Sequence, residues 1–326
     1  MKPDVKKAPD RSGILAARKA IDPYIHRTHV LTSTALNTIT GCHLYCKCEN
    51  FQKGGAFKFR GASRAVMGLS DSEAARGVAT HSSGNHAQAL SLAAHKRGIR
   101  ADIVMPENAP RVKVSAVKSY GGNITFCKPT LADREATLQS VIEKNGALEI
   151  HPYNDYRIIS GQATAAAELF EDTPPLDCLV VPVGGGGLLS GSILSSRYFS
   201  SKTAVFGAEP ECADDAYQSF QQQKLIPVQN PQTIADGLRT SLGSLTFPII
   251  RDGVTDILTV TEEGIMRAMF LIWERMKIIV EPSAAVTVAA IMEHPGIFAG
   301  KHTGIILSGG NIDLYHLPWL DQPVKH

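Results

Sequence analysis

Short strand-like segments alternate with helix-like segments along almost the entire chain. The predicted strands, each short and mostly bounded by Gly or Pro, are His43–Lys47, Gly77–Thr80, Ala101–Val104, Asn123–Phe126, Asp177–Val183, Ala204–Ala208 and Thr303–Leu307. Helix-like runs lie between them and include Asn85–Lys96, Arg111–Ser119, Ala132–Lys144 and Ser160–Phe170. This alternation is typical of parallel sheets whose faces are covered by helices. The chain is therefore predicted to be an α/β protein.

One part of the chain, from about residue 77 to residue 152, repeats the strand–helix unit with short links. We interpret it as a small mobile domain inserted into a larger one, which comprises residues 1–76 and 153–326. A chain of 326 residues is long enough for two such domains. Each domain is expected to be an open, mostly parallel, twisted sheet flanked by helices.

Composition and charge argue against several classes of protein. A formal net charge of +2, with no run of Lys or Arg, gives no reason to expect nucleic acid or an acidic membrane surface as a partner. No apolar stretch is long enough to span a bilayer, and the first residues lack the apolar segment of a secretory signal, so we expect a cytoplasmic protein. Six cysteines are too few for a disulfide scaffold in a chain of this length. We interpret them as structural thiols, with Cys46 and Cys48 on the same face of a strand.

Lys58 lies in the segment FQKGGAFKFRG, between the apolar residues Phe57 and Phe59. Apolar surroundings destabilise an ammonium group, so they lower the pKa of the lysine and leave a nucleophilic amine. A neutral amine of this kind can form a Schiff base with an aldehyde. The segment by itself leaves open a surface lysine at the start of a helix.

The segment THSSGNHAQ follows a predicted strand and leads into a predicted helix. Ser and Gly in such a turn direct backbone N–H groups toward an anion, and the helix N-terminus adds partial positive charge. A substrate carboxylate would fit there. The alternative is an ordinary helix cap made by Ser82 or Ser83. His86, considered by itself, is more typical of a structural residue than of a catalytic base.

Two further strands are predicted to run into glycine-rich turns. VPVGGGGLLSG places four consecutive glycines between a strand and a helix, where the backbone can approach a phosphate and offer several N–H donors. Its spacing is neither that of a dinucleotide-binding G-x-G-x-x-G turn nor that of a P-loop. In IILSGGNID, Ser308 could offer a hydroxyl group to a ring nitrogen, although a simple strand-to-helix turn would also explain that segment.

Four carboxylates crowd into the segment EPECADD, namely those of Glu209, Glu211, Asp214 and Asp215. Mg²⁺ and Ca²⁺ prefer carboxylate and carbonyl oxygens, so the segment is a candidate cation site. The alternative is a solvated acidic helix start, which the helix dipole favours.

Together these segments resemble the fold-type II family of pyridoxal-phosphate (PLP) enzymes, which includes serine racemases, threonine dehydratases and tryptophan synthase β. The resemblance runs from about Ile14 to Asp313. It is carried, in the expected order, by FQKGGAFKFRG, THSSGNHAQALSLAA, VPVGGGGLLSG, AEPECADDAYQS, TIADGLRTSLG, WERMK, VEPSAAV and LSGGNID. It implies a two-domain PLP enzyme that acts as an amino-acid racemase and ammonia-lyase.

The resemblance implies a set of cofactor contacts. Lys58 would bind PLP covalently and serve as the base on one face of the substrate. The other contacts would be Phe57, Asn85, Gly184, Gly185, Gly186, Gly187, Leu188 and Ser308. Phe57 would pack near the ring, Asn85 would hydrogen-bond its hydroxyl group, and the glycines with Leu188 would cradle the phosphate. Ser308 would face the ring nitrogen without holding it protonated, which makes the ring a weaker electron sink.

Ser83 is the position that discriminates best within the family. Its serine and threonine dehydratases usually carry S-A-G-N-H, whereas its racemases carry S-S-G-N-H, as this chain does. Racemisation needs a proton donor on each face of the substrate α-carbon. The hydroxyl group of Ser83 would serve the face opposite Lys58.

The activity that the resemblance implies is interconversion of L- and D-serine, with β-elimination of serine to pyruvate and ammonia as a side activity. The alternative is a catabolic serine/threonine dehydratase or a threo-3-hydroxyaspartate ammonia-lyase, because the latter also carries S-S-G-N-H. A third alternative is a PLP-binding protein without catalysis. Substrate contacts would be Ser82, Ser83, Asn85, His86, Arg134 and Ser241. Arg134 would come from the small domain, so closure of that domain would complete the site.

The resemblance also implies ligands other than the substrate. Glu209, the carbonyl group of Ala213 and Asp215 match the family's site for a divalent cation, which would be Mg²⁺, Ca²⁺ or Mn²⁺. ATP, an allosteric activator of vertebrate members, would be contacted by Ser33, Thr34, Lys53, Gln88, Lys113, Tyr120, Lys277 and Asn311. Gly54 stands where those members have a threonine, and Leu15 where they have an acidic contact, which argues against ATP activation. A homodimer is expected from the family.

Overall fold

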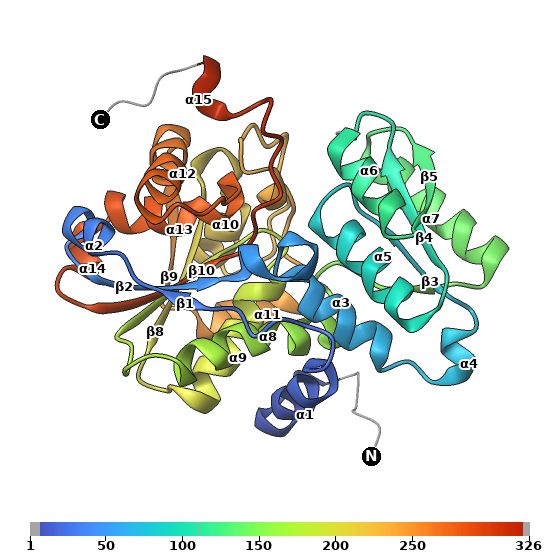
Figure 1. Ribbon diagram of the computed structural model, residues 1–326, viewed down its shortest axis with the longest axis horizontal. Coiled ribbons are helices and arrows are strands. Elements are labelled where there is room, and N and C mark those ends of the chain that lie inside the picture. Colours follow the sequence, from blue (N-terminus) through green and yellow to red (C-terminus); the bar gives the residue numbers. More distant parts are fainter. Residues whose placement is uncertain (1–6, 110, 322–326) are drawn as a thin grey trace.

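The computed structural model describes residues 7–109 and 111–321 and shows two β-sheets in two lobes (Figure 1). The larger sheet has the strand order β1-β2-β10-β7-β8-β9. Its strands are β1 (Val30–Leu31), β2 (His43–Cys48), β7 (Cys178–Pro182), β8 (Ala204–Pro210), β9 (Asp256–Val260) and β10 (His302–Leu307). Only β1 pairs antiparallel; the other strands pair in parallel. The loops after β7, β8 and β10 therefore leave from the same edge of the sheet, where ligands of such sheets bind.

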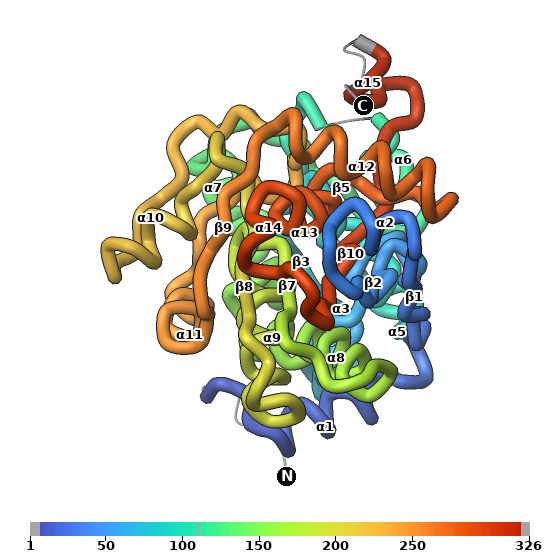
Figure 2. Tube along the Cα trace, turned by 90° about the vertical axis from the view of Figure 1, so that its left-hand side faces the viewer, coloured from blue at the N-terminus to red at the C-terminus, as the bar shows by residue number. Residues whose placement is uncertain are grey.

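Helices cover both faces of the larger sheet (Figures 1 and 2). One face packs against α2 (Thr34–Thr40), α12 (Glu262–Met276), α13 (Pro282–Glu293) and α14 (Pro295–Phe298). The other packs against α8 (Tyr156–Glu171), α9 (Gly187–Phe199) and α11 (Thr246–Gly253), with α1 (Arg11–Ile21) outside α8. The remaining helices of this lobe are α10 (Asp215–Gln222), α15 (Pro318–Asp321) and the 3-10 turns η1 (Glu49–Phe51), η2 (Lys53–Gly55), η3 (Glu211–Ala213) and η4 (Asp236–Leu238).

Burial on both faces explains why the central strands read as nearly continuous apolar runs. All five residues of β7 are buried, and so are the last five of β10. The alternation in β2 places Cys46 and Cys48 in one hydrophobic cluster, as predicted. Burial raises the pKa of the Cys48 thiol to about 12, which makes it an unreactive packing group. No helix within residues 7–109 and 111–321 is long and apolar enough to cross a membrane.

The smaller sheet has the order β5-β4-β3-β6 and is entirely parallel. Its strands are β3 (Val78–His81), β4 (Ala101–Pro106), β5 (Asn123–Cys127) and β6 (Leu148–Glu149). The helices α5 (Asn85–Arg97) and α6 (Arg111–Ser119) cover one face, α7 (Leu131–Asn145) covers the other, and α4 (Asp71–Ala74) precedes β3. Helix α3 (Lys58–Met67) packs against α8 of the larger lobe and α5 of the smaller one, so it lies between them (Figure 1).

The predicted fold class is confirmed, because both sheets are mostly parallel and flanked by helices. Each predicted strand and helix is present, with ends that differ by a few residues at most. Sequence analysis missed β1, β6 and β9, of which the first two have only two residues each. The chain passes from one sheet to the other between β2 and β3 and returns between β6 and β7. The domain borders at residues 77 and 152 stay a prediction.

Candidate active site

Lys58 is the first residue of α3, and its segment runs beside the segment that follows β10. The Phe57 N–H donates to the Ser308 carbonyl at 3.0 Å, and Ala56 forms an isolated bridge with Gly309. The two segments are about 250 residues apart in sequence, yet this pairing brings Lys58 and Ser308 to one site. The amine of Lys58 in turn donates to the carbonyl of Pro152 at 2.8 Å.

The Lys58 amine is buried between aromatic rings, and its pKa is lower than that of an ordinary lysine. Its Nζ lies 5.2 Å from the ring centroid of Phe57 and 5.9 Å from that of Tyr153. Burial lowers the pKa of Lys58 to about 8, although the charge of Glu281 opposes the shift. At pH 7 roughly one amine in ten is then unprotonated, far more than for an ordinary lysine. This is the state in which a lysine attacks an aldehyde.

A buried ion network holds the start of α3 in place. Arg60 is fully buried and donates to Glu49 at 2.8 Å and to Glu168 at 2.7 Å. Lys47, also fully buried, donates to the other oxygen of Glu168 at 2.7 Å. Two cations and two carboxylates balance each other, so removal of either cation would leave a charge buried without its partner. The network ties α3, which carries Lys58, to β2, η1 and α8.

The four-glycine turn joins β7 to α9 and fits a phosphate group. Gly186 has φ +85°, a conformation that side chains disfavour, and a Cβ on Gly185 would lie only 2.2 Å from the Tyr153 ring. The hydroxyl group of Thr246, at the start of α11, donates to the carbonyl of Gly185 at 2.9 Å and stabilises the turn. The first N–H groups of α9 have no acceptor within the helix, so they can bind an anion at this end.

The loop between β3 and α5 carries Ser82 and Ser83, and Asn85 is the first residue of α5. The interpretation of either serine as the helix cap is wrong, because Gly84 occupies the cap position and no side chain caps the helix. The Ser82 hydroxyl accepts from the Gly84 N–H at 3.3 Å. The Ser83 hydroxyl is half-buried and makes no hydrogen bond to another described residue, so it is available to a ligand.

Asn85 belongs to a hydrogen-bonded chain that sequence analysis did not anticipate. Its Nδ2 donates to Glu281 at 2.8 Å, and its Oδ1 accepts from Asn311 at 3.0 Å. Asn311 also donates to the carbonyl of Gly54 at 2.8 Å. One N–H of Asn85 remains for a ring hydroxyl. Burial, with the charge of Asp236 as the second cause, raises the pKa of Glu281 to about 8.

Sequence analysis did not identify Glu281 as a site residue. It precedes Pro282, and a Glu-Pro pair is typical of an ordinary helix start. Sequence analysis also missed Tyr153. Its segment, HPYND, carries no pattern that predicts packing of the tyrosine ring against a glycine turn elsewhere in the chain.

His86 is buried and neutral. Burial, together with the nearby charge of Lys58, lowers the pKa of His86 to about 3. Its Nε2 lies 3.0 Å from the carbonyl of Ile150, which favours the tautomer with the proton on Nε2. Its Nδ1 then carries a lone pair rather than a proton, and it has no partner among the described residues. The predicted contact of His86 with a substrate carboxylate stays a prediction.

Arg134 and Ser241 come from opposite lobes. Arg134 belongs to α7, and its charge lies near Tyr153 and His81. Burial raises the pKa of Tyr153 to about 12, with Arg134 opposing the shift. Burial also lowers the pKa of His81, and Arg134 reinforces that shift. Ser241 follows η4, and its hydroxyl accepts from the Val228 N–H at 2.8 Å.

Glu209 and Asp215 form a pair of buried carboxylates away from Lys58. Glu209 is the next-to-last residue of β8 and is 1% exposed. Its carboxylate accepts a hydrogen bond from the Tyr217 N–H at 2.6 Å. Asp215 begins α10, is 3% exposed, and accepts from the Leu242 N–H at 3.3 Å. Burial raises the pKa of both carboxyl groups, and the charge of Asp215 raises that of Glu209 further. The prediction of a solvated acidic helix start is wrong for these two residues, because neither is exposed.

The eight residues predicted to contact ATP are spread over both lobes, and at least five of them have side-chain partners within the chain, including Asn311 with the contacts described above. Ser33 caps α2. Lys53 donates to the carbonyl of Tyr24 at 2.6 Å, and Lys277 donates to that of Glu274. Lys113 pairs with Asp236 across the two lobes. These contacts would have to open or rearrange before the side chains could meet a nucleotide.

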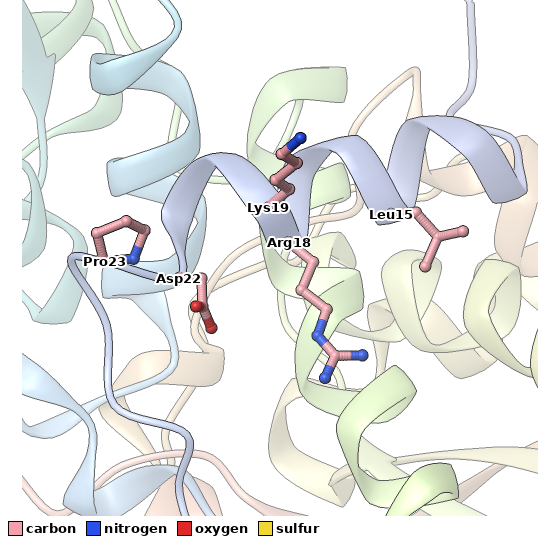
Figure 3. A pocket seen from close by; sticks show the side chains of 5 residues that line it. All are labelled: Leu15, Arg18, Lys19, Asp22 and Pro23. Carbon is pink, nitrogen blue, oxygen red and sulfur yellow. The ribbon is translucent and has the colours of Figure 1, made fainter.

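A hollow of about 340 Å³ on the surface of α1 is unrelated to these residues (Figure 3). It is lined by Leu15, Arg18, Lys19, Asp22 and Pro23, most of them exposed. Arg18 is engaged in an ion pair with Glu171 at 2.5 Å. None of the polar side chains that line the hollow is buried, whereas Lys58 is buried with a lowered pKa, so the candidate active site is the one around Lys58.

Comparison with known proteins shows the family to which the chain belongs. A family model described as "Pyridoxal-phosphate dependent enzyme" matches residues 21–309. A β-hydroxyaspartate dehydratase of Paracoccus denitrificans (strain Pd 1222) is 49% identical over 95% of this chain and 99% of its own length. A serine racemase of Arabidopsis thaliana is 50% identical over 95% of each chain. The crystal structure of serine racemase from Dictyostelium discoideum matches with a TM-score of 0.89 at 48% identity, covering 94% of this chain and 99% of that one. The chain therefore belongs to the fold-type II family of pyridoxal-phosphate-dependent enzymes.

Proposed function

We propose that the protein interconverts L- and D-serine and also eliminates serine to pyruvate and ammonia. The observation that carries the proposal is the position of Lys58, whose pKa burial lowers to about 8. Its Nζ lies 5.9 Å from the Tyr153 ring, which packs over the glycine turn, and its charge acts on His86 at the start of α5. PLP, when bound, supplies an electron sink that stabilises negative charge at the substrate α-carbon. The relatives at 49–50% identity include both a racemase and a dehydratase.

The residues around Lys58 fit PLP. Lys58 would hold the cofactor aldehyde, and the backbone N–H groups of residues 184–188 would bind its phosphate. Asn85 would direct its remaining N–H to the ring hydroxyl, because Glu281 and Asn311 already fix its amide. Ser308 would meet the ring nitrogen, and Phe57 would pack beside the ring. Each of these roles follows from a side chain or turn placed near Lys58.

Two groups would move the substrate α-proton. Lys58 would remove or return it on one face, where its neutral amine is the base. Ser83 would act on the other face, because its hydroxyl has no partner among the described residues and lies in the loop between β3 and α5, apart from the helix that carries Lys58. Ser82 and the backbone N–H groups at the N-terminus of α5, that of Asn85 among them, would bind the substrate carboxylate, and Ser241 and Arg134 would approach it from the two lobes.

Glu209, the Ala213 carbonyl and Asp215 would bind a divalent cation that stabilises the larger lobe. Both carboxylates are almost completely removed from water, and no Lys or Arg is paired to either among the described residues. A hard cation would neutralise their charge. We favour Mg²⁺, with Ca²⁺ or Mn²⁺ as alternatives.

Addition of Mg²⁺ to chelator-treated protein is expected to raise its melting temperature by about 5 °C at a cation concentration of about one hundred times Kd. The reason is that the cation would bind the folded state, in which the two carboxylates are buried and the charge of Asp215 acts on Glu209, and not the unfolded state. Calorimetry with and without Mg²⁺ measures the change. Asp215→Asn should lose the response, whereas Glu211→Gln, a change at an exposed carboxylate, should keep it. An equal response in Asp215→Asn would contradict the cation site.

ATP activation and a homodimer stay predictions from the family. The internal contacts of Ser33, Lys53, Lys113 and Lys277, together with Gly54 and Leu15, weigh against a preformed ATP site.

A second candidate is an ammonia-lyase acting on 3-hydroxyaspartate. The observation in its favour is the position of Arg134, whose charge lies near Tyr153 and thus on the Lys58 side of the small lobe. A guanidinium group there could pair with a second substrate carboxylate, which serine lacks. The dehydratase relative from Paracoccus denitrificans supports the same alternative.

Incubation with L-serine, followed by chiral separation and a pyruvate assay, tests the proposal. We expect both D-serine and pyruvate, because one site serves both outcomes. An ammonia assay, which detects elimination from serine and from the diastereomers of 3-hydroxyaspartate alike, compares kcat/KM between the two candidates. Pyruvate without any D-serine, or turnover of 3-hydroxyaspartate alone, would contradict the racemase assignment.

A further inference from the structure

Gln162, in the middle of α8, is fully buried, yet neither polar atom of its carboxamide has a hydrogen-bond partner among the described residues. A buried amide without partners costs free energy comparable to the hydrogen bonds it fails to make. Buried polar side chains are therefore almost always paired, with the chain, with water or with a ligand. An amide kept in this state points to a partner that the polypeptide does not supply.

Gln162 lies between the helix that carries Lys58 and the glycine turn. Its Cγ is 3.2 Å from the place where a Cβ on Gly61 would stand, and Gly61 is about one turn after Lys58 in α3. Its Oε1 is 2.5 Å from the corresponding place on Gly187, the fourth glycine of the turn. Any side chain at position 187 would meet the carboxamide, so this glycine leaves room for Gln162. The amide thus reaches the first turn of α9, where a phosphate would bind.

Among the described residues, no Lys, Arg or His side chain is one of the nearest neighbours that a Cβ on the glycines of the turn would meet. The side chains that a Cβ on these glycines would approach most closely are those of Tyr153, Gln162, Thr240, Leu242, Thr246 and Ile250. A phosphate at this turn would therefore be held by neutral donors, namely backbone N–H groups and any amide within reach. A carboxamide can turn by 180° about its last bond, so either its oxygen or its two N–H donors can face the turn.

We propose that the carboxamide of Gln162 donates a hydrogen bond to the phosphate group of PLP. The residue is then a cofactor contact in addition to the backbone of the glycine turn. It also joins the two halves of the cofactor site, because the same side chain packs on the helix that carries Lys58.

The affinities of the apoenzyme for PLP and for pyridoxal test the proposal. Both compounds carry the aldehyde that Lys58 attacks, but only PLP carries the phosphate. In Gln162→Met, which keeps the length of the side chain without its donors, Kd for PLP should rise about tenfold while Kd for pyridoxal stays unchanged. In Gln162→Glu the rise should be larger, because a carboxylate would repel the phosphate. Absorbance titration of the Schiff base gives both constants without any turnover.

The apoenzyme should respond to Gln162→Met in the opposite sense. Removal of an unpaired buried amide takes away its desolvation cost, so the apo variant should melt at the same temperature as the wild type or higher. An unchanged ratio of the two dissociation constants in both variants would overturn the proposal. A lower melting temperature combined with that unchanged ratio would assign Gln162 a purely structural role. These outcomes do not depend on which substrate the enzyme turns over.

Discussion

Lys58→Ala is expected to abolish both racemisation and elimination, with a loss of about 10⁴-fold or more in kcat/KM for each. The change removes the amine that holds the cofactor and the base that moves the α-proton. It also removes the one lysine whose pKa burial lowers to about 8 at this site. Chiral separation of serine and the pyruvate assay, run on the same sample, measure both losses.

The matched control is Lys118→Ala, which removes an exposed lysine of α6 and should leave both activities intact. Lys58→Arg is a second test, since it keeps a positive charge but offers no amine. It should be as inactive as Lys58→Ala, because the expected defect concerns bond formation and not charge. Activity of Lys58→Arg near that of the wild type would contradict the assigned role.

Ser83→Ala is expected to separate the two activities. Racemisation should fall by about 10²–10³-fold, because the face opposite Lys58 loses its proton donor. Elimination should stay close to the wild-type rate, because Lys58 and the cofactor contacts are untouched. The half-buried Ser83 hydroxyl makes no hydrogen bond within the part of the chain that the structure describes, so its removal should disturb the fold little. The ratio of D-serine to pyruvate formed from L-serine measures the separation.

Ser82→Ala is the matched control for that experiment, since Ser82 is the neighbouring hydroxyl on the same loop. Its hydroxyl accepts from the Gly84 N–H and would bind the carboxylate, so its loss should affect both activities together. An equal loss of racemisation and elimination in Ser83→Ala would refute the assignment of Ser83 as the second proton donor.

Local chemistry made part of the site predictable from the sequence. The apolar neighbours of Lys58 predict a lowered pKa, and the structure places the amine beside Phe57 with a pKa of about 8. Four glycines after an apolar strand predict an open turn, and Gly186 adopts the positive φ that such a turn needs. In both cases the decisive neighbours lie within a few residues along the chain.

Long-range packing made the rest unpredictable. Glu281 and Asn311 meet Asn85 only because the segments after β10 and before α13 fold onto the start of α5. Gln162 looks like any polar residue of a helix until its burial is known. The strands β1 and β6 were missed because two residues carry no periodic signal. The roles of Glu281, Asn311 and Gln162 depend on contacts between segments far apart in the chain, and no local sequence pattern predicts such contacts.

Borohydride reduction of the protein with PLP bound, followed by peptide mapping, tests the central claim most directly. Reduction makes the bond between the cofactor and its lysine permanent, so the labelled peptide identifies the residue. The account predicts a single label on the peptide that contains Lys58. A label on any other lysine, with Lys58 unmodified, would contradict it.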